Sequence, residues 1–535
     1  MAESSIQTSG QLFELVQTLR LFGDSKTFVD SLPLRDNASI ERELDAFLAQ
    51  FLHIHPELGL AEGGGPAAFL IALPDDHPAR IELAQQLKDW VLERFMLQAR
   101  SMEEHIEAMW SVLERRSPQP PAGSSLIALP NPYIVAGGRY LESYYWDSYF
   151  TCLGLAVSGR VEMLRATVDN FAHLIRQFGY IPNGTRTYYL GRSQPPFFAQ
   201  LVRLLEISAG PETANDYFEE LAREHVFWMD ENGGRRVQLA AQVLNRDWDS
   251  HDTPRPEGYA EDVQTAREAG VAGPYRAHLY RDLRAAAESG WDFSSRWIAP
   301  DQDGHFALAR VHTTQILPVD LNALLYSQER ILADFAARRG DAARAGTFRA
   351  NADARKTAIL ARFWDADAGW FFDYDYVAEH RTQVWSLAGM APLFCGVLDA
   401  SLPAEREIVR RVRNHLVERF LRKGGVVTTL NRTGQQWDMP NGWAPLQWLA
   451  AIGLLKYGYS EDAHEIAARF SRLARRVHAE TGKMMEKYDV CNPDRPGGGG
   501  EYPNQEGFGW TNGVVSAFLD LLDKGSGSLA ARLLK

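Results

Sequence analysis

The sequence predicts an all-α protein. Apolar residues recur at helical spacing in several separate segments, as at Leu164, Val168, Phe171 and Ile175. Strand signals are short and scattered and do not alternate regularly with helices, which disfavours a doubly wound or TIM-type fold. With 535 residues, of which 45% are hydrophobic, the chain is long enough for one large repetitive fold or for several domains.

The chain divides into three predicted parts. Residues 1–125 contain a strongly helical run and the turn-rich sequence SPQPPAGS, so we expect a helical appendage that packs on the main body. Residues 126–523 alternate helical segments with long loops rich in Gly, Pro, Asn and Trp. Long loops inside a compact domain are typically functional. Residues 524–535 are predicted to form a C-terminal tail.

Composition and charge exclude several kinds of partner. The chain has 56 Lys and Arg against 69 Asp and Glu, and its net charge of -13 repels a phosphate backbone, so we expect no nucleic acid partner. The sequence has no run of 18 apolar residues, and its N-terminus lacks the pattern of a signal peptide. We therefore expect no membrane partner and a cytoplasmic location. A monomer is the default expectation, because a chain of this size buries its own core.

Five loop segments stand apart from the helical background because they are both polar and aromatic. They are GGRYLESYYWDSYF at 137–150, PNGTRTYYLGRSQPP at 182–196, ESGWDFSSRW at 288–297, QQWDMPNGWAPLQW at 435–448 and the long run at 484–513. A sugar site needs this mixture, since Arg and carboxylate side chains bind vicinal hydroxyls and aromatic rings cover the apolar sugar face. Hydrolysis of a glycosidic bond also requires two carboxyl groups that flank it.

Asp292 has the surroundings of a general acid. It is flanked by Gly290, Trp291 and Phe293, and an apolar, aromatic setting raises the pKa of a carboxyl group. A general acid needs such a raised pKa in order to carry a proton near neutral pH. The alternative interpretation is that Asp292 caps a helix that opens at Ser294.

Glu486 has the surroundings of a general base. Lys487 stands beside it, and a nearby cation keeps a carboxylate ionised. The alternative interpretation is that Glu486 forms a surface salt bridge, which would give the same neighbours in the sequence. The four glycines at 497–500 lack the spacing of a phosphate-binding loop, and we interpret them as part of a lid over a small substrate.

Other chemistries lack their motifs. The sequence has no HExxH, no EF-hand loop and no GxSxG, and its 14 histidines are dispersed. The three cysteines, Cys152, Cys395 and Cys491, lie far apart and form no CxxC pair, so we expect neither a disulfide framework nor a zinc site. The sequence thus predicts no metal and no cofactor.

Together, the polar segments resemble the trehalase family of glycoside hydrolases, in its bacterial cytoplasmic type. Two stretches are similar to the signature motifs of that family, GGRYLESYYWDSYF and QWDMPNGWAP. Five further stretches are similar to the other hallmark stretches of that family and occur in the same order: PNGTRTYYLGRSQPP, RPEGY, ESGWDFSSRW, EKYDV and GGGGEYPNQEGFGWTNG. The resemblance spans about Phe28 to Leu522 and implies that residues 126–523 form an (α/α)6 barrel with a pocket at one end. Ala136 and Tyr140 depart from the family pattern, which has Pro and Phe there.

The resemblance also implies roles for the matching residues. Asp292 would protonate the glycosidic oxygen of α,α-trehalose, and Glu486 would activate the attacking water, with inversion and without a cofactor. The substrate, a small disaccharide, would be bound by Arg139, Trp146, Asp147, Asn183, Arg192, Ser193, Gln194, Arg255, Pro256, Glu257, Gly290 and Glu501.

Two alternative functions stay open at the level of the sequence. The first is a related helical-barrel glycosidase or phosphorylase that acts on another disaccharide. Release of glucose 1-phosphate in the presence of phosphate would identify a phosphorylase. The second is a non-catalytic trehalose-binding protein, which would bind trehalose and release no glucose.

Overall fold

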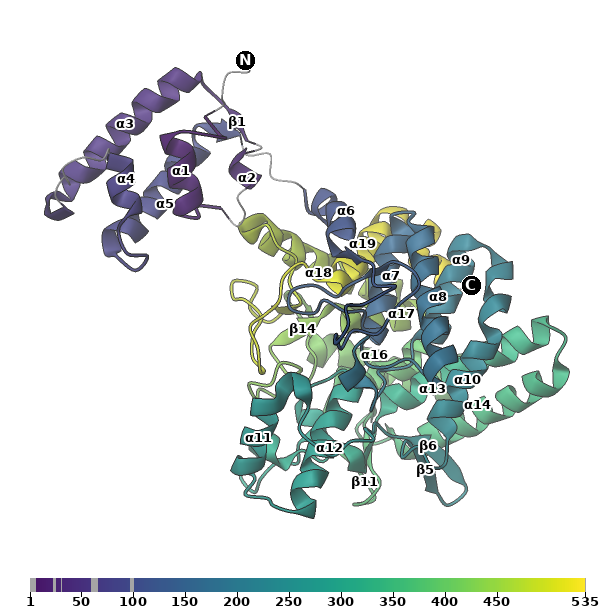
Figure 1. Ribbon diagram of the computed structural model, residues 1–535. Coiled ribbons are helices and arrows are strands. Elements are labelled where there is room, and N and C mark those ends of the chain that lie inside the picture. The colour runs from purple at the N-terminus through teal and green to yellow at the C-terminus, as the bar shows by residue number, and fades with distance from the viewer. Residues whose placement is uncertain (1–5, 23–25, 30, 59–65, 97–100, 535) are drawn as a thin grey trace. The chain divides into compact units, whose positions relative to one another are not determined.

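The computed structural model (Figure 1) describes residues 6–22, 26–29, 31–58, 66–96 and 101–534. The chain divides into two compact units. The first comprises Met1–His105 and Arg475–Lys483, and the second comprises Ile106–Ala474 and Met484–Lys535. The boundary predicted at residue 125, and the packing of the appendage on the main body, stay predictions.

The first unit is helical and has an apolar core of its own. Its elements are α1 (Gln11–Thr18), α2 (Lys26–Val29), β1 (Leu32–Pro33), α3 (Asn37–Ile54), α4 (Pro66–Ile71), α5 (Pro78–Leu92) and β2 (Phe95–Met96). Strands β1 and β2 pair antiparallel. Three of its helices contribute the buried side chains Leu12, Leu48 and Leu87 to the core. Helices α6 (Met102–Leu113) and α18 (Ser460–Thr481) belong partly to each unit.

The second unit is a barrel of two rings of helices. The inner ring consists of α7 (Tyr145–Val157), α9 (Phe198–Ala209), α13 (Val319–Arg338), α15 (Ala391–Phe394), α17 (Ala444–Lys456) and α19 (Gly509–Lys524). Each inner helix contacts the next, and α19 contacts α7, so the ring is closed. The chain makes an outer helix between successive inner helices, namely α8 (Val161–Phe178), α10 (Phe218–Met229), α14 (Ala342–Arg362), α16 (Pro403–His415) and α18. The predicted (α/α)6 barrel is confirmed.

The apolar pattern of each helix explains its ring. Every residue of α17 from Ala444 to Leu454 is buried, and a helix that is apolar on all sides belongs inside a protein. Helix α8 buries one face, which includes the predicted positions Leu164, Val168 and Phe171. Its opposite face is polar, so it packs in the outer ring.

Three further helices lie outside the two rings. They are α11 (Tyr259–Glu268), α12 (Pro274–Glu288) and α20 (Leu529–Leu533). Helix α20 lies in the predicted tail, where Leu529 and Ala530 are buried. None of the described helices is long and apolar enough to cross a membrane.

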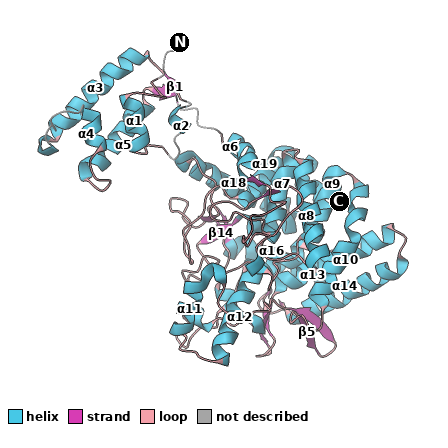
Figure 2. Cartoon of the chain, viewed as in Figure 1, coloured by secondary structure: helices cyan, strands magenta, loops and turns pink. Residues whose placement is uncertain are grey.

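The strands of the second unit are short and connect loops (Figure 2). They are β3 (Glu114–Arg115), β4 (Tyr133–Ile134), β5 (Arg236–Leu239), β6 (Gln242–Asn245), β7 (Ile316–Leu317), β8 (Trp364–Asp365), β9 (Trp370–Phe371), β10 (Tyr374–Asp375), β11 (His380–Arg381), β12 (Leu421–Arg422), β13 (Gly425–Val426), β14 (Asn441–Trp443) and β15 (Lys487–Asp489). Strands β14 and β15 pair antiparallel and set Trp443 opposite Lys487. This pairing joins two of the polar aromatic segments, which are distant in the sequence.

Candidate active site

A cavity of about 260 Å³ lies in the second unit and is lined by all five polar aromatic segments. Several of its lining residues directly precede an inner helix: Tyr144 precedes α7, Trp443 precedes α17 and Phe508 precedes α19. The cavity therefore lies at the end of the barrel where these inner helices begin. Its volume is close to the lower end of the range for small-molecule sites.

Asp292 lies in the loop after α12 and lines the cavity. Its side chain is 34% exposed, and Arg255 Nη1 lies 3.8 Å from its Oδ2. Burial among the surrounding protein raises the pKa of Asp292 to about 7, and the Arg255 guanidinium opposes this rise. The next turn is capped by Ser294, whose side chain accepts the N–H of Arg296. The interpretation of Asp292 as that helix cap is therefore wrong.

Glu486 immediately precedes β15 and is 2% exposed. Lys487 Nζ donates to its Oε2 at 3.0 Å, and the Tyr502 hydroxyl donates to its Oε1 at 2.8 Å. Burial raises the pKa of Glu486, while Lys487 and Tyr502 oppose the rise because they stabilise the carboxylate. The pair with Lys487 is buried, so the interpretation as a surface salt bridge is wrong.

Two buried arginines hold other polar groups of the cavity wall. Arg192 donates to Asn183 Oδ1 at 3.1 Å and forms a close ion pair with Glu257. Arg255 lies 3.1 Å from Glu501, which belongs to the segment after the four glycines. The Oε2 atom of Glu257 is buried and has no hydrogen-bond partner among the described residues, so a ligand hydroxyl can satisfy it.

Indole rings form part of the cavity wall. Trp437 stacks on Trp443 with ring centroids 3.9 Å apart and an interplanar angle of 1°, and Trp146 lies 5.7 Å from Trp437. Gly290 has φ of 77°, and a Cβ atom there would lie 2.9 Å from the Trp146 ring. Glycine therefore allows the loop of the general acid candidate to lie directly against this wall.

Comparison with known proteins identifies the family. The family model described as Trehalase matches residues 20–523, nearly the whole chain. The chain belongs to the trehalase family. Periplasmic trehalase from Pseudomonas aeruginosa is 43% identical over 536 residues, which cover 97% of this chain and 90% of that protein. Periplasmic trehalase from Xanthomonas campestris pv. campestris is 44% identical over 520 residues, with coverage of 96% and 85%.

A solved structure supports the fold of this trehalase-family chain. Neutral trehalase from Saccharomyces cerevisiae aligns with a TM-score of 0.62 and 24% identity, covering 86% of this chain and 88% of that one. The likeness to this structure concerns the fold. The family model and the curated relatives confirm the predicted enzyme class and function, a glycoside hydrolase that cleaves trehalose.

The predicted location is wrong. Both trehalase relatives are named periplasmic, which contradicts the cytoplasmic location and the cytoplasmic type expected from the sequence. The expectation rested on the pattern of the first residues and on the absence of a long apolar run. A targeting segment is removed during export and does not depend on the mature fold, so neither feature determines the compartment. Cys152 and Cys395 are buried free thiols, which pack as small apolar groups.

The barrel brings together most of the site residues predicted for this trehalase-family chain. Those that line the cavity are Arg139, Trp146, Asp147, Asn183, Arg192, Gln194, Arg255, Glu257, Gly290, Asp292, Glu486 and Glu501. Ser193 and Pro256 are not among the lining residues. The Ser193 hydroxyl donates to the backbone oxygen of Ile181 at 2.7 Å, and Pro256 begins a short 3-10 helix.

Several residues of the site had no predicted role. Trp437, Trp443, Tyr502 and Trp510 line the cavity. Trp437 and Trp443 lie in the polar aromatic segment QQWDMPNGWAPLQW, and their position in a loop was the available signal. Tyr502 lies in the polar aromatic run at 484–513, but its hydrogen bond to Glu486 could not be predicted, because the fold brings the two residues together.

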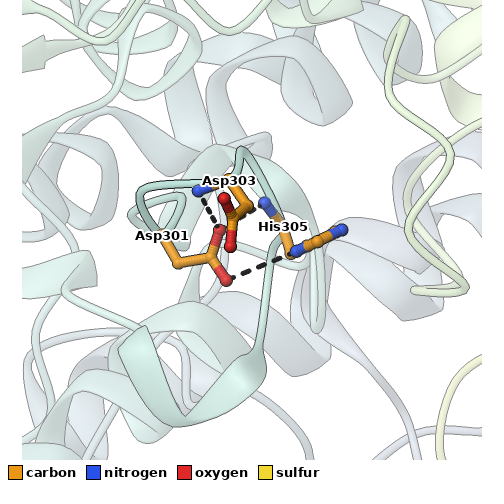
Figure 3. A group of neighbouring side chains, drawn as sticks. All are labelled: Asp301, Asp303 and His305. Carbon is orange, nitrogen blue, oxygen red and sulfur yellow. Dashed lines mark hydrogen bonds and ion pairs between the residues drawn. The ribbon is translucent and has the colours of Figure 1, made fainter.

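One group of side chains in the described chain could hold a metal ion by geometry: Asp301, Asp303 and His305 (Figure 3). All three are exposed. The Asp301 carboxylate accepts the backbone N–H groups of Asp303 at 2.9 Å and of His305 at 2.8 Å. These bonds close a turn, which explains why the three side chains lie together.

Proposed function

We propose that Asp292 is the general acid and Glu486 the general base with which this trehalase-family enzyme hydrolyses α,α-trehalose. The observation that carries the proposal is that one cavity contains two carboxyl groups in different settings, with Glu486 buried beside a cation and Asp292 partly exposed beside Arg255. Asp292 has a pKa raised to about 7, so it holds a proton near neutral pH. Glu486 is paired with the Lys487 ammonium, which favours its ionised form.

In the proposed reaction, the two carboxyl groups act on opposite faces of one sugar ring. Asp292 donates its proton to the glycosidic oxygen as the bond from that oxygen to C1 breaks. Glu486 accepts a proton from the water whose oxygen bonds to C1. The attacked ring leaves as β-glucose and the other ring leaves as α-glucose, with no covalent intermediate.

We propose that the remaining lining residues bind the sugar hydroxyls. Glu257 contributes its buried, unpartnered Oε2, and the charged groups Arg192 and Arg255 hold the loops in place. The indoles of Trp146 and Trp437 offer apolar surface to a sugar ring. Tyr140, a departure from the family pattern, also lines the cavity, so its hydroxyl group stands close to the substrate.

The direct experiment is an assay of glucose release by the purified full chain. Trehalose is the substrate, maltose and sucrose are the controls, and no metal or phosphate is added. We expect release from trehalose, with equal first-formed amounts of α- and β-glucose by NMR. Release that depends on phosphate and yields glucose 1-phosphate would indicate a phosphorylase, and binding without release would indicate a binding protein. Equal release from maltose would reject the substrate assignment.

The pH profile of kcat/KM is expected to be bell-shaped. Asp292 must be protonated and its pKa is raised to about 7, so activity should fall as pH rises through about 7. Glu486 must be ionised and its pKa is raised, so the acid limb should lie above the ordinary pKa of glutamate. Measurement from pH 4 to about 9 checks both limbs.

Asp147 provides a control for the alkaline limb. It lines the same cavity, and burial raises its pKa to about 8. Asp147→Asn should lower kcat/KM through lost substrate contacts and keep the alkaline limb in place. If the limb disappears in this variant, the assignment of that limb to Asp292 is wrong.

We also propose a monomer that acts on a free disaccharide, with no nucleic acid or membrane partner. The closed inner ring supports the monomer, because the barrel buries its own core. The names of the two bacterial relatives support a periplasmic location. Sedimentation of the purified chain tests the monomer, and fractionation of cells tests the location.

A further inference from the structure

We infer that Gln436 is a positioning residue that links the general acid to the general base. Its side-chain amide lies between the backbone of Asp292 and the ammonium of Lys487, which in turn holds Glu486. The inference rests on the proposed roles of Asp292 and Glu486. It assigns a task to Gln436, which lies behind the cavity wall and is 2% exposed.

Three hydrogen bonds make the link. Gln436 Nε2 donates to the backbone oxygen of Asp292 at 2.5 Å, and Lys487 Nζ donates to Gln436 Oε1 at 2.9 Å. The same ammonium donates to Glu486 Oε2 at 3.0 Å. One amide therefore uses both of its ends, and the two catalytic groups are connected through two side chains that never need to touch the substrate.

The amide is well suited to this task because it is both donor and acceptor. A carbonyl oxygen requires a donor, and a buried ammonium requires acceptors, so a carboxylate or a hydrocarbon at this position could not satisfy both. Lys487 is fully buried, and within the described part of the chain its ion pair is with Glu486. The Gln436 oxygen therefore helps to keep the ammonium beside the base.

Neighbouring side chains and a close glycine hold Gln436 in place. Its backbone oxygen accepts from Trp443 Nε1 and from Asn441 Nδ2, both at 3.0 Å. Gly500, with φ of 81°, packs so closely that a Cβ atom there would lie 2.9 Å from Gln436 Cβ. Two of the polar aromatic segments thus hold the backbone and the Cβ atom of Gln436, from which the amide extends.

The charges that face Glu486 determine how the link affects its titration. Lys487 is its cation and the Tyr502 hydroxyl is its second hydrogen-bond donor. The Asp147 carboxyl group and the Tyr140 hydroxyl also interact electrostatically with it. A new negative charge at position 436 would compete with Glu486 for Lys487. The base would then lose part of the stabilisation of its ionised form.

The test uses two variants of the full chain. Gln436→Met removes both hydrogen bonds of the amide, and we expect kcat for trehalose to fall by about 10- to 100-fold while KM changes by less than about threefold. Gln436→Glu keeps the size of the side chain and adds the competing charge. We expect it to move the acid limb of kcat/KM to higher pH.

Gln447→Met is the matched control. Gln447 is a fully buried amide in α17 whose side chain accepts from the Val426 N–H at 2.7 Å and donates to the Val426 backbone oxygen at 2.8 Å. Both ends of this amide are therefore used within the barrel, away from Asp292, Lys487 and Glu486. Its loss should lower Tm and leave the acid limb unchanged. A wild-type kcat in Gln436→Met, or an unmoved acid limb in Gln436→Glu, would overturn the inference. Failure of the wild-type chain to release glucose would instead reject the proposed function.

Discussion

Asp292→Asn is expected to lower kcat for trehalose by about 10²- to 10⁴-fold, the usual contribution of a general acid. Asparagine has nearly the same shape, so the loop against Trp146 should be preserved. Its amide has no acidic proton to give to the glycosidic oxygen. The measurement is glucose release at saturating trehalose, together with KM, which should change little because the contacts to the sugar remain.

A substrate that needs no acid separates a chemical role of Asp292 from a structural one. α-Glucosyl fluoride loses fluoride without protonation, so Asp292→Asn should hydrolyse it within about tenfold of the wild-type rate. Asp147→Asn is the control, because Asp147 lines the same cavity. This variant should lower the rate on trehalose and the rate on the fluoride by the same factor. Equal losses of Asp292→Asn on trehalose and on the fluoride would show that Asp292 is not the acid.

Glu486→Ala is expected to reduce hydrolysis by a similar factor of about 10²- to 10⁴-fold. Without the carboxylate, no group accepts the proton of the attacking water. The loss should affect trehalose and α-glucosyl fluoride equally, in contrast to the loss in Asp292→Asn. Measuring the rates of both variants on both substrates therefore assigns acid and base separately.

Azide gives an independent check of the base. It is an anion that attacks C1 without giving up a proton, and removal of the Glu486 side chain leaves space for it. Azide should restore glucose release in Glu486→Ala and yield β-glucosyl azide, while the proton from Asp292 goes to the departing glucose. The change also leaves the buried Lys487 without its carboxylate partner, which destabilises the fold. The Tm of Glu486→Ala must therefore be compared with that of the wild type. A folded variant that forms α-glucosyl azide would exclude single inversion.

Periodicity in the sequence was sufficient to predict the helices of the barrel. The spacing of Leu164, Val168, Phe171 and Ile175 marks one apolar face, and these residues are buried in α8. Helical periodicity is a local property, since residues three and four apart lie on one face of a helix. The closure of α7, α9, α13, α15, α17 and α19 into a ring depends on contacts between distant helices, and the number of helices in the ring came from family resemblance.

The sequence predicted which residues belong to the candidate site better than it predicted which of them contact one another. Neighbours in sequence suggested the environments of Asp292 and Glu486, and Lys487 lies where its position beside Glu486 indicated. Ser193 and Pro256 share their motifs with lining residues and still face other partners. A motif identifies a segment, whereas the direction of each side chain depends on the backbone of the folded loop.

The sequence by itself determined the helical class, the motifs of the trehalase family and the two carboxyl groups proposed for catalysis. These follow from local spacing and from residue identity. The tertiary structure decided which groups meet: Gln436 reaches Asp292 across 144 positions of the chain, and Arg255 reaches Glu501 across 246. The physical reason is that burial and the pairing of charges depend on every segment packed around a group. The pKa of Asp292 and the partners of Glu486 therefore arise from the closed barrel.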